Sequence, residues 1–300
     1  MDSRLVDKYI PLVNEISDKY GYDDNIKHLL YLIIPAFVTK YSIYKENLII
    51  NTFSNVRIMI SEEISSTTYA FYTSIPHYEK DKIITVKYIV IQNYQNVSLV
   101  QLMDNLVHEF NHAVNSYQKE MLIDEHVLSL RTGLTYARYS LPDLSPIKKD
   151  DSYILEEILN TNQTEEIINI IKCYSDPNHV NLNTTIYSLN HETGSQYTSQ
   201  AYYLENTLMK SILDNKTFLA TLNNLRLSGD VEDIEGWFDH ITGDKKSYYQ
   251  LNQYLLELMK LEEKFSDQKF FRNGIITKMK QLVQKILNII TTFNQNCNYK

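Results

Sequence analysis

Residues 98–117 read SLVQLMDNLVHEFNHAVNSY and combine a helical repeat with side chains that bind metals. Apolar residues recur every three or four positions here, which places them on one stripe of an α-helix. The stripe consists of Leu99, Leu102, Met103, Leu106, Phe110 and Val114. Ser98 is of a residue type that caps helix N-termini, so we expect the helix to begin there. His108 and His112 fall on the opposite side of the helix.

Two histidines and a glutamate within five residues indicate a metal centre. Residues four apart on a helix share a face, so His108 and His112 can reach one ion. Glu109 points to the side, where its carboxylate can take a proton from water. Zn²⁺ suits hydrolysis because it lowers the pKa of bound water to about 7 and polarises a carbonyl. The alternative interpretation is a solvated helix face that carries these residues by chance.

The segments around this helix predict an α+β fold. The clearest strand covers residues 82–92, where Ile84, Val86, Tyr88 and Val90 alternate with other residues and the turn-rich segment 93–96 follows. Further expected strands cover residues 47–51, 56–60 and 67–72, and helices cover 3–20 and 26–38. A hairpin is expected over 127–139, turning at Thr132-Gly133, and a helix over 151–172. The rest is helical in pattern, with breaks at Gly194, Gly229 and Gly243 and a final helix over about 265–293.

The segment LEEILNT, residues 155–161, offers a third ligand. With this segment the chain resembles the gluzincin group of metallopeptidases, the thermolysin-like arrangement in which a helix after HExxH supplies a glutamate. The resemblance implies that His108 and His112 are zinc ligands, that Glu109 is the general base and that Glu157 is the third ligand. The resemblance covers roughly residues 80–170 and is specific only at the HExxH motif.

The choice of Glu156 or Glu157 as the third ligand depends on the resemblance. Helical geometry alone does not choose between Glu156 and Glu157, because both border the same apolar arc. The resemblance favours Glu157, since the ligand of the family directly precedes a small residue. The chain departs from the family at Ile158, which replaces that residue, and at Thr161, where an aspartate often supports a zinc-bound histidine. A supporting partner for His108 is therefore not identified from the sequence.

The implied fold is a zincin-like core with a mixed sheet and an active-site helix, followed by a mostly helical C-terminal part. We place the boundary near residue 175, which gives a catalytic core over 1–175 and a helical region over 176–300. The expected function is zinc-dependent hydrolysis of peptide bonds, by Glu109-assisted attack of a zinc-bound water. An edge strand near residues 82–92 is expected to pair with an extended peptide or protein substrate. The rival hypothesis is a non-catalytic binding or interaction module with a vestigial or structural metal site.

Other residues are weaker candidates. His126 is a rival ligand, although we expect a loop position for it. Stabilising the developing oxyanion requires a donor, for which the sequence offers Tyr197, Tyr202, Tyr203 and His191.

Composition limits the class of partner. The net charge of −8 gives no basic footprint for nucleic acid or anionic lipid, and no stretch approaches the length of a membrane span. The start of the chain lacks the features of a secretory signal, so we expect a cytoplasmic protein. Cys173 and Cys297 lie far apart, which favours two free thiols over a disulfide.

Overall fold

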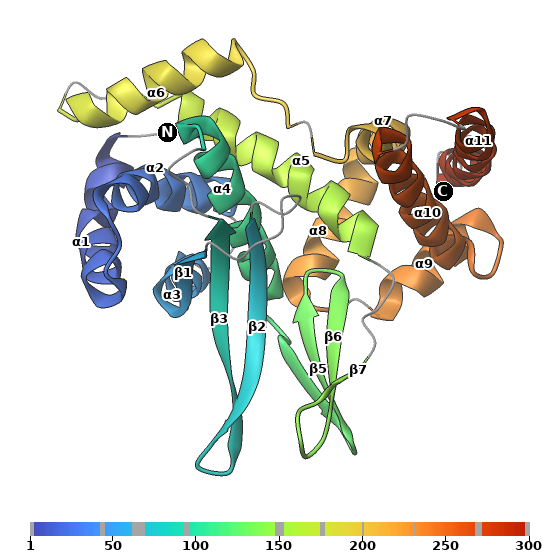
Figure 1. The fold of residues 1–300 in the computed structure, drawn as a ribbon, viewed down its shortest axis with the longest axis horizontal. Coiled ribbons are helices and arrows are strands. Elements are labelled where there is room, and N and C mark those ends of the chain that lie inside the picture. The colour runs from blue at the N-terminus through green and yellow to red at the C-terminus, as the bar shows by residue number, and fades with distance from the viewer. Residues whose placement is uncertain are drawn as a thin grey trace. The chain divides into compact units, whose positions relative to one another are not determined.

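The computed structural model describes residues 3–42, 46–61, 70–92, 97–147, 153–174, 178–199, 201–230, 232–267 and 272–297. The fold is α+β with a helical C-terminal part, as expected (Figure 1). By packing, it divides into two compact units, Met1–Tyr117 with Asn160–Ser199 and Gln118–Leu159 with Gln200–Lys300. Helix α5 (Tyr153–Lys172) runs unbroken from the second unit into the first. These bounds differ from the division near residue 175, which stays a prediction.

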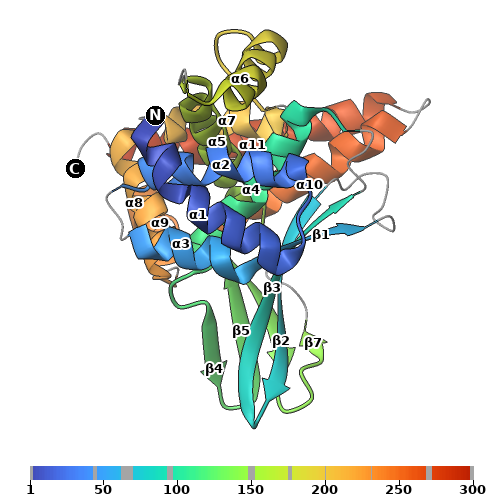
Figure 2. The ribbon, with the colours of Figure 1, turned by 90° about the vertical axis from the view of Figure 1, so that its left-hand side faces the viewer.

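The first unit packs helices against a three-stranded sheet. Its elements are α1 (Ser3–Tyr20), α2 (Asp24–Lys40), α3 (Glu46–Asn55), β1 (Val56–Ser61), β2 (Ala70–Glu79), β3 (Lys82–Gln92), α4 (Leu99–Ser116), most of α5, and α6 (Val180–Thr193). The strand order is β1-β3-β2, with β1 parallel and β2 antiparallel to β3. Helices α1, α2 and α3 group together at one end of the long β2–β3 hairpin (Figure 2).

Helix α4 forms as its sequence predicts. The hydroxyl of Ser98 accepts a hydrogen bond from the backbone N–H of Gln101 at 3.1 Å, which caps the helix. The apolar stripe from Leu102 to Val114 is buried. At its centre the ring of Phe110 stacks on that of Phe53, with centroids 4.0 Å apart. Burial of this stripe fixes which side of α4 carries His108 and His112.

Three expectations for this unit are wrong. Residues 47–51 belong to helix α3, because Leu48, Ile49, Thr52 and Phe53 form one buried face at helical spacing. β3 is the central strand, so β1 and β2 form the two edges of the described sheet. β2 also continues to Glu79, beyond the expected end at residue 72. The expected segments 67–69 and 93–96 lie outside the described residues.

The second unit combines an antiparallel sheet with a helical bundle. Its strands are β4 (Met121–Asp124), β5 (Val127–Thr132), β6 (Thr135–Ser140) and β7 (Pro146–Ile147), paired in that order. Its helices, besides the start of α5, are α7 (Tyr203–Leu213), α8 (Lys216–Ser228), α9 (Glu232–Thr242), α10 (Ser247–Asp267) and α11 (Arg272–Cys297). The hairpin turns at Gly133 as predicted, with φ +56°. The expected final helix over 265–293 is instead the end of α10 and most of α11.

Aromatic side chains form the centre of the helical bundle. Phe293 of α11 lies against Phe218 and Phe238, with ring centroids 4.6 and 4.8 Å away. Cys173 and Cys297 are free thiols, as expected. Within the described residues, no helix is both long and apolar enough to cross a membrane.

Candidate metal centre

A buried polar network joins the polar side of α4 to α5. The side-chain amide of Asn111 donates to Thr164 Oγ1 at 3.2 Å, and that of Asn115 donates to Gln163 Oε1 at 3.0 Å. The hydroxyl of Tyr41 donates to Asn111 Oδ1 at 2.9 Å. Buried polar groups that find partners in this way rigidify a core and specify one arrangement. The network therefore fixes the register of the two helices.

The same network reaches the histidine motif directly. Asn160 Nδ2 donates to the backbone oxygen of His108 at 2.7 Å. Glu157 precedes Asn160 by three residues on α5, so the two side chains lie on the same side of the helix. Fixing Asn160 on the His108 turn therefore brings the Glu157 carboxylate to the two histidines.

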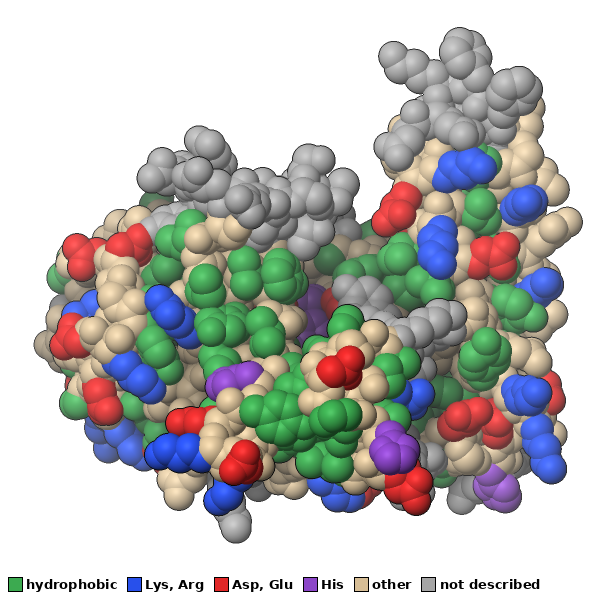
Figure 3. All heavy atoms as spheres, turned by 60° about the horizontal axis from the view of Figure 1, so that its bottom comes forward, with side chains coloured by type: hydrophobic (Ala, Val, Ile, Leu, Met, Phe, Trp, Pro, Cys, Tyr) green, Lys and Arg blue, Asp and Glu red, His purple; other side chains and the backbone are tan. Residues whose placement is uncertain are grey.

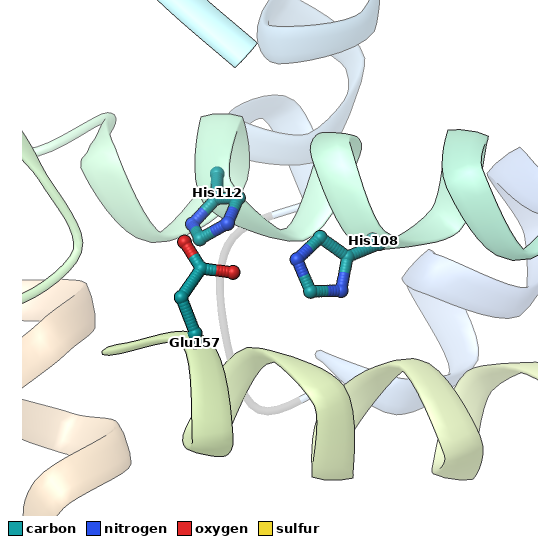
Figure 4. A group of neighbouring side chains, drawn as sticks. All are labelled: His108, His112 and Glu157. Atoms are coloured by element: carbon teal, nitrogen blue, oxygen red, sulfur yellow. The ribbon is translucent and has the colours of Figure 1, made fainter. Parts of the chain in front are cut away.

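His108, His112 and Glu157 form one compact group. A ligand atom from each lies within 4.8 Å of the other two. Figure 4 shows both imidazole rings and the carboxylate facing one another from α4 and α5. His112 and Glu157 are buried, and His108 is half-buried. The structure therefore brings together the three residues predicted as ligands, in a group that can hold a metal ion.

The donor set fits a catalytic zinc site. Two imidazole nitrogens and a carboxylate oxygen are a known zinc ligand combination that leaves a fourth position open. Tetrahedral coordination with bonds of about 2.0–2.2 Å separates ligand atoms by about 3.4 Å. In the structure these atoms lie within 4.8 Å of one another.

Glu109 lies beside this group and is held by the sheet. Its carboxylate is buried, and Oε2 accepts a hydrogen bond from the backbone N–H of Tyr72 at 2.6 Å. Tyr72 belongs to β2, one of the two edge strands. Glu109 is absent from the group that can hold a metal. This carboxylate is therefore not one of the three side chains that the structure brings together as possible ligands.

The carboxylate of Glu156 binds other residues, so Glu157 is the one of the two glutamates that lies with the histidines. Its Oε2 accepts hydrogen bonds from Arg226 Nε at 2.8 Å and from the backbone N–H of Leu134 at 2.9 Å. Its Oε1 pairs with the other end of the same guanidinium. Both partners of this ion pair are buried. Glu156 therefore serves the core of the second unit, and Glu157 alone of the two carboxylates joins the histidines.

The other candidate residues lie outside the group. His126 is exposed at the turn between β4 and β5, and His191 is exposed near the end of α6. Tyr203 is 63% exposed, and Tyr202 is the N-cap residue of α7. Tyr197, by contrast, is buried and hydrogen-bonds the carboxylate of Asp104 on α4. The three-residue group formed by His108, His112 and Glu157 is the one such group of His, Cys, Asp and Glu side chains in the described part of the chain.

The chain matches no protein-family model, no curated protein and no solved structure. We therefore infer the function from the chemistry of the residues themselves.

Proposed function

We propose that the protein is a zinc-dependent metallopeptidase with a zincin-like core. The observation that supports this best is the convergence of His108, His112 and Glu157 from two helices. Glu109 adds a buried carboxylate that directly follows one proposed ligand and is bound by the sheet. A structural zinc site needs no such adjacent base, and it normally has four protein ligands. The combination therefore favours a hydrolytic site over a structural one.

Each residue has a distinct role in this proposal. His108 and His112 bind through neutral imidazole nitrogens, and Glu157 through a carboxylate oxygen. When bound, Zn²⁺ supplies a Lewis acid that acidifies water and polarises the scissile carbonyl. Glu109 accepts the proton of the attacking water and then delivers it to the leaving nitrogen. The hydrogen bond from Tyr72 holds one carboxylate oxygen in place while this exchange occurs.

The edge strand β2 suggests how a peptide binds. It contributes the N–H that reaches Glu109, so its outer edge faces the catalytic helix at this point. Phe71 and Ile75 lie on one face of the strand and are 40% and 49% exposed. The β2–β3 hairpin points to the bottom of the view in Figure 1. Figure 3 brings that side of the view forward, and hydrophobic side chains gather on it. We propose that an extended peptide lies along β2 and packs apolar side chains on this strand.

The first test is metal removal. Protein purified without added metal is expected to contain about one zinc ion per chain and to cleave a mixed peptide library. Treatment with a chelator should abolish cleavage, and added Zn²⁺ should restore it, because without the ion Glu109 has no acidified water from which to take a proton. Cleavage is followed by mass spectrometry, which also reports the residues on either side of the cut. Because Phe71 and Ile75 are apolar and exposed, we expect apolar residues in the substrate beside the cut.

Two results would argue against the proposal. Full cleavage after complete chelation would exclude a zinc hydrolase. Tightly bound zinc with no cleavage of any library member would support the rival hypothesis of a structural metal in a binding module.

A further inference from the structure

Asp104 lies one helical turn before His108 on α4. Residues four apart on a helix are neighbours on one face, so the carboxylate lies on the His108 side of the helix. Burial raises the pKa of the Asp104 carboxyl, whereas the hydrogen bond from Tyr197 and the nearby charge of His108 act in the opposite direction. The interaction with His108 places the two side chains close together.

The hydroxyl of Tyr197 anchors Asp104. Tyr197 is itself fixed on α5, because its backbone N–H donates to Asn169 Oδ1 at 2.9 Å. Asn169 Nδ2 in turn donates to the backbone oxygen of Tyr197 at 3.1 Å. The phenol is therefore presented to Asp104 from a rigid support.

One oxygen of Asp104 has no hydrogen-bond partner among the described residues. Oδ1 is buried and accepts no hydrogen bond from any described residue. Leaving a buried charged oxygen without a donor costs free energy, so a donor is expected at this position. The imidazole of His108, one turn away, has two ring nitrogens, and only one of them can bind a metal.

We propose that Asp104 is the positioning residue of the metal centre, and that its Oδ1 accepts a hydrogen bond from the ring nitrogen of His108 that does not face the metal. This inference rests on the proposed function, since it concerns the ion bound by His108. Such a bond fixes the tautomer and the orientation of the ring and makes it a better ligand. In this chain Asp104 takes the role that the family assigns to an aspartate at position 161, where Thr161 stands.

The test compares zinc affinity in Asp104→Asn and two control variants. Asparagine keeps an oxygen that can accept the hydrogen bond from Tyr197, but it removes the negative charge that faces His108. Its affinity for Zn²⁺, measured at one fixed pH against a chromophoric chelator, is expected to fall about 10- to 100-fold. The visible absorption of the Co²⁺-substituted protein should change as well, because the orientation of His108 changes. A purely structural role for Asp104 would leave the Co²⁺ spectrum unaltered.

Glu165→Gln and Thr161→Val are the matched controls. Glu165 is half-buried near Asp104 and Tyr197, and accepts a hydrogen bond from the backbone N–H of Ser199 at 2.9 Å, so its change removes an equivalent charge. Thr161→Val removes a buried hydroxyl that also lacks a described partner. Both controls are expected to stay within about twofold of the unaltered protein, because neither supports His108.

The outcomes distinguish the inference from the proposed function. Failure of the unaltered protein to bind Zn²⁺ would overturn the proposed function itself. Normal zinc binding with unchanged affinity in Asp104→Asn would overturn the positioning role alone, as would an equal loss in Glu165→Gln. A loss confined to Thr161→Val would assign the role to Thr161. If Asp104→Asn does not fold, Tyr197→Phe removes the anchor instead and should weaken zinc binding a few-fold, while unchanged affinity would contradict the inference.

Discussion

The Glu109→Gln protein is expected to retain its zinc and to lose peptidase activity by on the order of a hundredfold or more. Glutamine still offers an oxygen to the backbone N–H of Tyr72, so the hydrogen bond of 2.6 Å between α4 and β2 can persist. An amide cannot accept the proton of the attacking water, so the chemical step slows. The measurements are kcat/KM for a peptide cleaved by the unaltered protein and the zinc content of each variant.

His112→Ala is the control for this variant. Removing one imidazole from the group of three should release the metal and abolish activity together. Activity lost with zinc retained in Glu109→Gln, and both lost in His112→Ala, would separate base from ligand. Equal zinc loss in both variants would mean that Glu109 supports the site structurally, and the proposed mechanism would be wrong.

Glu156→Gln is expected to lower the free energy of unfolding by about 3–5 kcal/mol. The variant removes the carboxylate that pairs with the buried guanidinium of Arg226. Arg131 lies in the same region, where burial lowers the pKa of its guanidinium and the charge of Glu156 opposes that shift. Removing the carboxylate therefore takes a nearby negative charge away from two buried cations. Urea denaturation of the metal-free protein measures the effect.

The adjacent Glu157→Gln is a closely matched control, because both residues are buried at the start of α5. Glu157→Gln should lose zinc, whereas Glu156→Gln should keep zinc and show the larger loss of stability in the metal-free protein. An unchanged urea midpoint in Glu156→Gln would contradict the structural role. Zinc lost from Glu156→Gln that still folds would reopen the choice of third ligand.

The local parts of the site could be predicted from the sequence. His108 and His112 share a helix, so their spacing alone determines a common face. The cap at Ser98 and the strand β3 also follow from patterns within about ten residues, and both are confirmed. The helix is also buried on its polar side, where the side-chain amide N–H groups of Asn111 and Asn115 donate hydrogen bonds to α5.

The long-range parts could not be predicted in this way. Glu156 and Glu157 differ because Arg226 lies 70 residues from Glu156 and pairs with it. Residues 47–51 have a composition typical of strands, but packing of Phe53 on Phe110 stabilises a helix instead. The repeat of Asn160 and Thr164 on α5, four residues apart like Asn111 and Asn115 on α4, was a signal for the polar network. Which residues they pair with depends on tertiary structure.

The location of zinc in a crystal of the metal-loaded protein tests the central claim most directly. Anomalous scattering at the zinc edge should reveal one ion bound to His108, His112 and Glu157, with each bond about 2.0–2.2 Å long. The Glu109 carboxylate should lie outside the bonding distance. An ion bound by Glu156, His126 or a cysteine, or no ion at this group in zinc-saturated protein, would contradict the account.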